Sequence, residues 1–246
     1  MPTAQSSAAD AHALEHARTG AIFGIVGILL SVVGTYLSFT YGGLSLGISC
    51  NSVTQTCSIP SAAVALLGGL FALEVIGTII GILFVLKFRS AFQTLVPVDY
   101  RFRSPASLSI LLVIGFILIV IGEGVLFASV ANIIGRCSNL NTTNCYNAAT
   151  GAAGALLASL GVLVLGAILA LIGGILLLIG IWRLGTRYDD SLLKVGAILL
   201  IIPFLDIAGI FLIYFGVTQA QGRLASAGTL SMPVASPPFA PPPGAP

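Results

Sequence analysis

The chain has 246 residues, of which 57% are apolar and only 7% charged, with a net charge of +2 and a mean hydropathy of +1.08. A soluble domain carries roughly 25% charged residues, so this composition excludes a water-facing surface around a globular core. It also excludes a disordered chain, which needs low hydrophobicity. The small net charge does not indicate nucleic-acid binding. We expect an all-α protein, a polytopic bundle of transmembrane helices.

Five apolar runs are each longer than the roughly 18 residues that cross a hydrocarbon core. They predict a five-helix transmembrane domain over residues 21–217, with spans at 21–41, 61–86, 108–134, 152–181 and 195–217. Residues 1–20 are predicted to be a cytoplasmic N-terminal segment, and residues 218–246 a disordered, Pro-rich tail. The first run is too long for the apolar part of a cleaved signal peptide, so we interpret it as an uncleaved anchor.

The basic residues predict an orientation. Eight of the ten Lys and Arg residues lie on the side of the N-terminus, and only Arg136 and Arg223 lie on the other. Since cytoplasmic segments are enriched in Lys and Arg, we expect a cell-membrane protein with a cytoplasmic N-terminus. Pro203 and Asp206 interrupt the fifth run, and a re-entrant run would return the tail to the inside. Because its 23 residues cannot cross twice, we favour one crossing and an outer C-terminus.

All four cysteines lie in the two predicted extracytoplasmic loops, Cys50 and Cys57 in the first, Cys137 and Cys145 in the second. Thiols on an oxidising face indicate disulfides. We favour pairing within each loop, while pairing between the loops stays open. A zinc site of four cysteines is disfavoured because six and seven residues separate the pairs, more than zinc ligands usually have between them. Asn141 begins a sequon on the same side and is a candidate glycosylation acceptor.

Three acidic residues lie near the middle of apolar runs: Glu74, Glu123 and Asp206. A charge at that depth costs on the order of 3 kcal/mol, so these side chains should face the interior of the bundle. The functional interpretation is a proton or cation site, because mid-membrane acids near Pro and Gly are typical of transporters. Two alternatives stay open. The acids could join helices by hydrogen bonds in neutral form, or they could meet a basic group on another subunit.

No catalytic residue is predicted. The sequence lacks H-E-x-x-H, the P-loop and G-x-G-x-x-G, and no predicted span contains a His that could ligate haem or copper. We therefore expect no enzyme, no metal and no cofactor. Basic residues near Arg101 and Arg183 are expected to contact anionic lipid head groups, as inside loops commonly do.

The segment from Ile181 to Pro203 is distinctive and includes Gly185-Thr186-Arg187-Tyr188. It resembles a family of multi-pass membrane proteins of unknown function found chiefly in thermophilic archaea. That family carries a Gly-x-Arg-Tyr segment between its last two spans and often a Pro-rich tail. The resemblance covers Ile181 to about Val217, and the remainder agrees mainly in hydropathy. It implies an archaeal plasma membrane, and it carries over no activity and no catalytic residue.

Two functions are compatible with these observations. We favour a non-enzymatic integral membrane protein, a structural or accessory subunit that acts through helix and loop contacts in a membrane assembly. Its expected partners are the lipid bilayer and other membrane subunits or copies of itself, with no nucleic acid. The alternative is a proton- or cation-linked transporter or channel that uses Glu74, Glu123 and Asp206.

Overall fold

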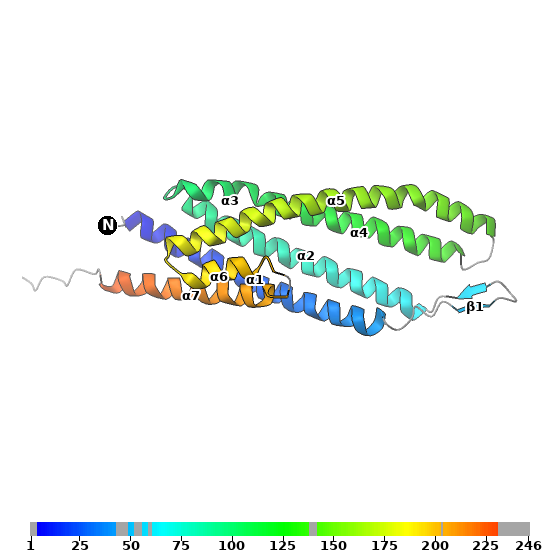
Figure 1. Cartoon of the computed structure of the whole chain (residues 1–246), viewed down its shortest axis with the longest axis horizontal. Helices are drawn as coiled ribbons and strands as arrows, with labels where there is room; N and C mark the ends of the chain where they lie inside the picture. Colours follow the sequence, from blue (N-terminus) through cyan, green and yellow to red (C-terminus); the bar gives the residue numbers. More distant parts are fainter. Residues whose placement is uncertain are drawn as a thin grey trace, which may run out of the picture.

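A computed structural model describes residues 4–42, 49–51, 56–58, 61–137, 142–202 and 204–230. The described chain forms an elongated helical bundle with a small β-ribbon at one end (Figure 1). The elements in chain order are α1 (Ala4–Gly42), β1 (Ser49–Asn51), β2 (Thr56–Ser58), α2 (Ser61–Leu95), the 3-10 turn η1 (Tyr100–Phe102), α3 (Arg103–Leu108), α4 (Ile110–Cys137), α5 (Thr142–Arg187), α6 (Ser191–Leu199) and α7 (Asp206–Leu230). This arrangement confirms the predicted all-α class.

Four helical segments are long and apolar enough to cross a membrane: Ala8–Leu37, Gly68–Leu95, Tyr100–Asn132 and Gly151–Arg187. In a bilayer every backbone N–H and C=O must be paired within the protein, so long apolar runs adopt helical structure. Helices α1 and α2 pack against each other as one hairpin, and α4 and α5 as a second. These helices indicate a membrane protein.

Residues 195–217 do not form one helix, so the predicted fifth span is not supported. Helix α6 ends at Leu199 and α7 begins at Asp206, and Pro203 lies between them in the sequence. Proline lacks a backbone N–H and disfavours helical geometry in the residue before it, which explains the break. The two helices pack antiparallel as a hairpin (Figure 1). Five spans are therefore not supported, and the outer C-terminus, which depended on the fifth crossing, loses its basis.

Glycines allow α6 and α7 to pack backbone against backbone. A Cβ added to Gly196 would lie 2.8 Å from the carbonyl oxygen of Gly209, and one added to Gly209 would lie 2.9 Å from that of Gly196. Gly216 of α7 lies equally close to Asp190, the buried N-cap residue whose Oδ1 accepts backbone hydrogen bonds from the first turn of α6. Small residues are typical of such close helix contacts.

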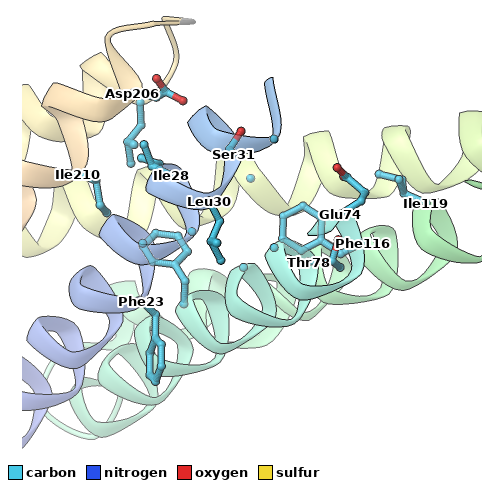
Figure 2. Close-up of a pocket in the computed structure, with 18 of the residues that line it drawn as sticks. Phe23, Ile28, Leu30, Ser31, Glu74, Thr78, Phe116, Ile119, Asp206 and Ile210 are labelled. Atoms are coloured by element: carbon cyan, nitrogen blue, oxygen red, sulfur yellow. The ribbon is translucent and has the colours of Figure 1, made fainter. Parts of the chain in front are cut away.

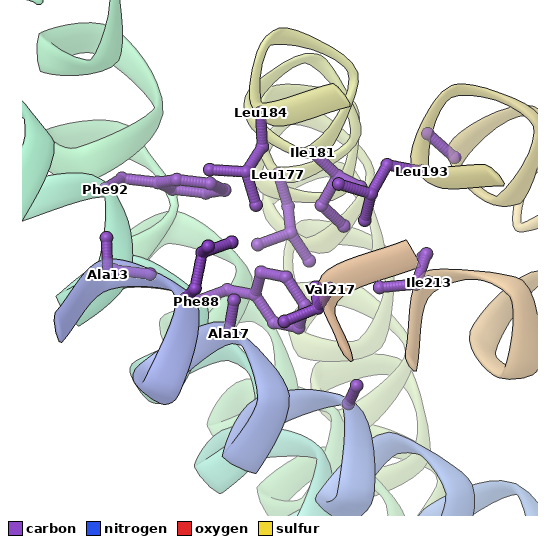
Figure 3. Close-up of a cluster of buried hydrophobic side chains, with 14 of the residues drawn as sticks. Ala13, Ala17, Phe88, Phe92, Leu177, Ile181, Leu184, Leu193, Ile213 and Val217 are labelled. Atoms are coloured by element: carbon purple, nitrogen blue, oxygen red, sulfur yellow. The ribbon is translucent and has the colours of Figure 1, made fainter. Parts of the chain in front are cut away.

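The buried core lies at the end of the bundle where α1 begins, and all seven α-helices and the turn η1 contribute to it (Figure 3). Fully buried members include Ala17 of α1, Phe88 of α2, Leu184 of α5, Leu193 of α6 and Val217 of α7. Beyond this core, the long helices expose large apolar side chains, among them Leu29, Ile79, Ile121 and Leu157. Such surfaces suit contact with lipid chains rather than water.

Both terminal segments contain more helix than the sequence predicts. Helix α1 includes most of residues 1–20, and α7 continues to Leu230 instead of ending near residue 217. Arg223 of α7 donates a 3.4 Å hydrogen bond from Nη1 to the carbonyl oxygen of Asp189, just after α5. The last described turns of α7 therefore lie at the same end of the molecule as the first turns of α1 (Figure 1). Residues 231–246 of the predicted tail lie outside the described residues.

Candidate functional site

A cavity of about 750 Å³ lies next to the buried core, between the two long hairpins and the α6–α7 hairpin (Figure 2). Its polar side chains are those of Ser31, Thr35, Glu74, Thr78 and Asp206. Within the described part of the chain, all other lining residues are apolar or glycine, and no Lys, Arg or His is among them. We name this space the acid cavity, because the ionisable groups among its described lining residues are carboxyls.

Glycine accounts for much of the free space in the acid cavity. Six of its lining residues are glycines: Gly24, Gly27, Gly34, Gly77, Gly81 and Gly174. A Cβ added to Gly77 of α2 or Gly174 of α5 would meet no atom within 4 Å. At Gly24 of α1, in contrast, a Cβ would lie 2.6 Å from Cδ1 of Ile210 in α7. The glycines thus bring α1 close to α7 at one point and leave room along α2 and α5.

The structure brings two of the three predicted acids to the acid cavity, on different helices (Figure 2). Glu74 lies on α2, and its residue is exposed. Asp206 is the first residue of α7 and half-buried, and its Oδ1 accepts a 2.9 Å hydrogen bond from the backbone N–H of Ile207. Asp206 is therefore not in the middle of a continuous helix, as the sequence suggested. It lies at a helix N-terminus, where the helix dipole stabilises negative charge.

Glu123, the third predicted acid, does not line the acid cavity. It lies half-buried on α4, within electrostatic range of Glu74. The rings of Phe71 on α2 and Phe127 on α4 stack with centroids 5.5 Å apart, and Phe127 follows Glu123 by about one helical turn. The three acids thus form a series, from Asp206 across the cavity to Glu74 and on to Glu123, rather than one cluster.

Carboxyl and hydroxyl groups at this depth can exchange protons, accept hydrogen bonds or contact a cation. Within the described residues, no group of three His, Cys, Asp or Glu residues is arranged to hold a metal ion. The acid cavity therefore offers acceptors without a matching donor of positive charge.

A second polar cluster, which the sequence did not reveal, involves the Gly-x-Arg-Tyr segment. Arg187 donates from Nε to Oδ1 of Asp10 at 2.9 Å and from Nη2 to Oδ2 at 3.3 Å. The hydroxyl of Tyr188 donates to the same Oδ1 at 2.9 Å. Burial, and then the charge of Asp10, raises the pKa of the Tyr188 phenol well above its ordinary range. Tyr188 is therefore protonated at neutral pH and acts as a hydrogen-bond donor.

The glycine of the same segment has a packing role. A Cβ added to Gly185 would lie 2.9 Å from Cγ of Lys194 and 3.0 Å from Cβ of Leu193, both on α6. Its carbonyl oxygen accepts a 2.8 Å hydrogen bond from the backbone N–H of Asp190, across a turn in which Asp189 has a φ of 46°. The Gly-x-Arg-Tyr segment thus lies at the end of α5, packs closely against α6 through Gly185, and binds Asp10 through Arg187 and Tyr188.

The cysteines are described only through the backbone of their elements. Strands β1 and β2 pair antiparallel in a register that places Cys50 opposite Cys57. Cys137 is the last residue of α4, and Cys145 lies in the first turns of α5. The cysteine side chains and Asn141 lie outside the described part of the chain, so the disulfide and glycosylation predictions stay predictions.

Comparison with known proteins gives one match. A family described as "Protein of unknown function (DUF973)" matches residues 10–244. No curated protein and no solved structure matches the chain. The matched region begins at Asp10 and includes both the acid cavity and the Gly-x-Arg-Tyr segment.

Proposed function

This chain belongs to the DUF973 family, whose function is unknown, and on that premise we propose that it is a non-enzymatic membrane protein acting through helix contacts. The observation that supports this most is the acid cavity, where glycines leave room and two carboxyls have no basic residue beside them among the described lining residues. The occupant we infer is a transmembrane helix of another membrane protein that carries a basic residue at the depth of Glu74 and Asp206. The chain would then be an accessory subunit of that assembly.

Two physical arguments favour this occupant. In lipid, helices associate mainly through van der Waals packing. Glycine has no side chain, so a glycine-rich face lets a second helix approach closely enough to pack well. Carboxyls at membrane depth are costly unless a partner satisfies them, and a basic group on a neighbouring helix would do so. Glu74 and Asp206 line the same cavity and offer acceptors along the path of one inserted helix.

The test is to fill the acid cavity. Gly77→Phe would place a ring in it, while Gly161→Phe on α5 is the matched control, since Gly161 has no atom within 4 Å of an added Cβ and does not line the cavity. In membranes solubilised with a mild detergent, the wild type and Gly161→Phe should migrate as a complex larger than the monomer, and Gly77→Phe as the monomer. Equal thermal unfolding of both variants would show that they are folded. A wild type that is only monomeric would contradict the proposal.

A second candidate is a proton- or cation-linked transporter or channel. It is favoured by the same acids, because Glu74 and Asp206 line one cavity and Glu123 lies on α4, which packs against the helix of Glu74. In proteoliposomes, Glu74→Gln and Asp206→Asn should then reduce proton or cation flux, since the amides cannot take up a proton. Glu15→Gln, at an exposed residue that does not line the cavity, should leave the flux unchanged. No wild-type flux over a range of pH and cations would exclude this function.

We also infer that both described ends of the chain face the cytoplasm. Arg223 now joins the basic residues near the N-terminus, so only Arg136 of the ten Lys and Arg residues lies toward the other end. Cytoplasmic faces of membrane proteins carry such an excess of Lys and Arg.

The cysteine loops would then be extracytoplasmic. The register of β1 and β2 supports a Cys50–Cys57 disulfide over pairing between loops. A peptide map without reduction tests that pairing. The archaeal plasma membrane stays an implication of the resemblance.

A further inference from the structure

Three arginines gather around a second hollow of about 680 Å³, at the end of the bundle that holds the basic residues. Arg101 and Arg103 come from the connection between α2 and α4, and Arg183 comes from α5. Tyr100, Ser104 and Ser107 complete its polar lining. We name this hollow the arginine pocket.

One contact between distant segments and one within α3 hold the arginine pocket in place. Arg183 donates from Nη1 to the carbonyl oxygen of Arg101, which ties α5 to the connection. Ser107 donates from Oγ to the carbonyl oxygen of Arg103 at 2.9 Å. The side chains of Arg101 and Arg103 remain exposed, and Arg183 is half-buried. The three arginines thus line the hollow, and these hydrogen bonds stabilise the backbone that carries them.

No carboxylate neutralises these three arginines in the part of the chain that the structure describes. The nearest acid in the sequence, Asp99, has other partners. Its Oδ1 accepts a 3.0 Å hydrogen bond from the backbone N–H of Arg101, and its Oδ2 lies 3.9 Å from Nη1 of Arg187. Like charges held together favour binding of an anion, and arginine forks match the oxygens of a phosphate.

The surroundings of the pocket place that anion at the membrane surface. Tyr100 is 80% exposed and Trp182, beside Arg183, is 44% exposed. Both lie at an end of a candidate membrane span, where Trp and Tyr are enriched at the level of the lipid head groups. Leu108, which also lines the pocket, is 43% exposed and leads into α4. An anion with an apolar tail could thus place its phosphate on the arginines and its chains along α4.

We propose that the arginine pocket is a binding site for the phosphate of an anionic phospholipid. The chemistry it recognises is a phosphate ester, and Arg101, Arg103 and Arg183 supply the positive charge. The site is separate from the acid cavity, and the proposal does not depend on the function assigned to that cavity.

The experiment uses the full-length protein in nanodiscs of phosphatidylcholine with or without phosphatidylglycerol, and it measures retained lipid by native mass spectrometry. The wild type should retain phosphatidylglycerol in preference to phosphatidylcholine. Arg103→Gln, at an exposed side chain, should reduce that preference about fivefold, in line with the attraction of one basic residue to an anionic surface. The triple variant, which combines Arg103→Gln with Arg101→Gln and Arg183→Gln, should abolish the preference for phosphatidylglycerol. Arg103→Lys should retain part of that preference. Arg18→Gln, at an exposed arginine of α1 that does not line the pocket, is the control.

Three outcomes would overturn the proposal. The wild type could show no preference for phosphatidylglycerol. The preference could persist in Arg103→Gln and in the triple variant, provided that both unfold at the wild-type temperature. Inorganic phosphate could displace the retained lipid completely, which would assign the pocket to a soluble phosphate instead of a head group.

Discussion

Arg187 at the end of α5 and Asp10 near the start of α1 form a two-point contact, with Nε to Oδ1 at 2.9 Å and Nη2 to Oδ2 at 3.3 Å. Their side chains are only 19% and 12% exposed, although 177 residues separate them in the sequence. Because α1 leads into the first hairpin and α5 ends the second, this contact joins the two hairpins at the end of the bundle that holds the core. It thereby fixes the end of α1 that the sequence assigned to a separate terminal segment.

We expect Arg187→Gln to lower the free energy of unfolding by about 3–5 kcal/mol, because it leaves the Asp10 carboxylate buried without its ionic partner. Thermal or denaturant unfolding in detergent measures the change. Glu15→Gln is the control, since Glu15 and His12 are 3.9 Å apart but more than 70% exposed, and it should change stability by less than about 1 kcal/mol. Equal losses in the two variants would contradict a structural role of the buried pair.

Tyr188→Phe should reduce stability at neutral pH by about 1.5–3 kcal/mol, because it removes a hydrogen bond to a charged group. The loss should shrink at high pH. Burial and the charge of Asp10 raise the pKa of Tyr188 in the folded protein, whereas the unfolded chain releases this proton near pH 10, the ordinary value for tyrosine. The folded state then binds more protons, so the Tyr188 contribution is complete below about pH 10 and falls by about 1.4 kcal/mol per pH unit above it.

The measurement compares unfolding of the wild type and Tyr188→Phe from neutral pH to about pH 11. The difference between the two proteins isolates Tyr188 from the other groups that titrate in this range. The gap should narrow as the pH rises. A constant gap would mean that Tyr188 ionises equally in both states.

The sequence predicted the long helices well and their end contacts poorly. Apolar runs longer than a bilayer leave little choice of structure, so α1, α2, α4 and α5 lie where four of the runs predicted them. The fifth run does not form one helix; Pro203 and Asp206 indicated an interruption, but the length of the run could not show that the chain turns back there. The sequence singled out Glu74, Glu123 and Asp206, and the structure places Glu74 and Asp206, but not Glu123, at the acid cavity. The role of Asp10 could not be predicted from the sequence, because its neighbours in the chain give no sign that it pairs with Arg187, which is 177 positions away.

The α6–α7 hairpin should depend on its glycine contact. Gly209→Ala would place a methyl group 2.9 Å from the carbonyl oxygen of Gly196 and 3.0 Å from the backbone nitrogen of Leu200. We expect a loss of about 1–3 kcal/mol from overpacking, measured by thermal unfolding. Gly222→Ala on the same helix meets no atom within 4 Å and should stabilise α7 by up to about 1 kcal/mol. If both variants behaved alike, close packing at Gly209 would not be the cause.

Finally, the hairpin predicts that the first turns of α1 and the last turns of α7 face the same side of the membrane. Single cysteines at Glu15→Cys and Gly222→Cys, with the four native cysteines replaced by Ser, allow a direct test. Both positions are exposed in the structure. In sealed right-side-out vesicles a membrane-impermeant maleimide should label neither cysteine, and after the membrane is opened it should label both. Labelling of Gly222→Cys alone in intact vesicles would show that the chain crosses a fifth time after α5, and would require α6 and α7 to separate from the hairpin seen here.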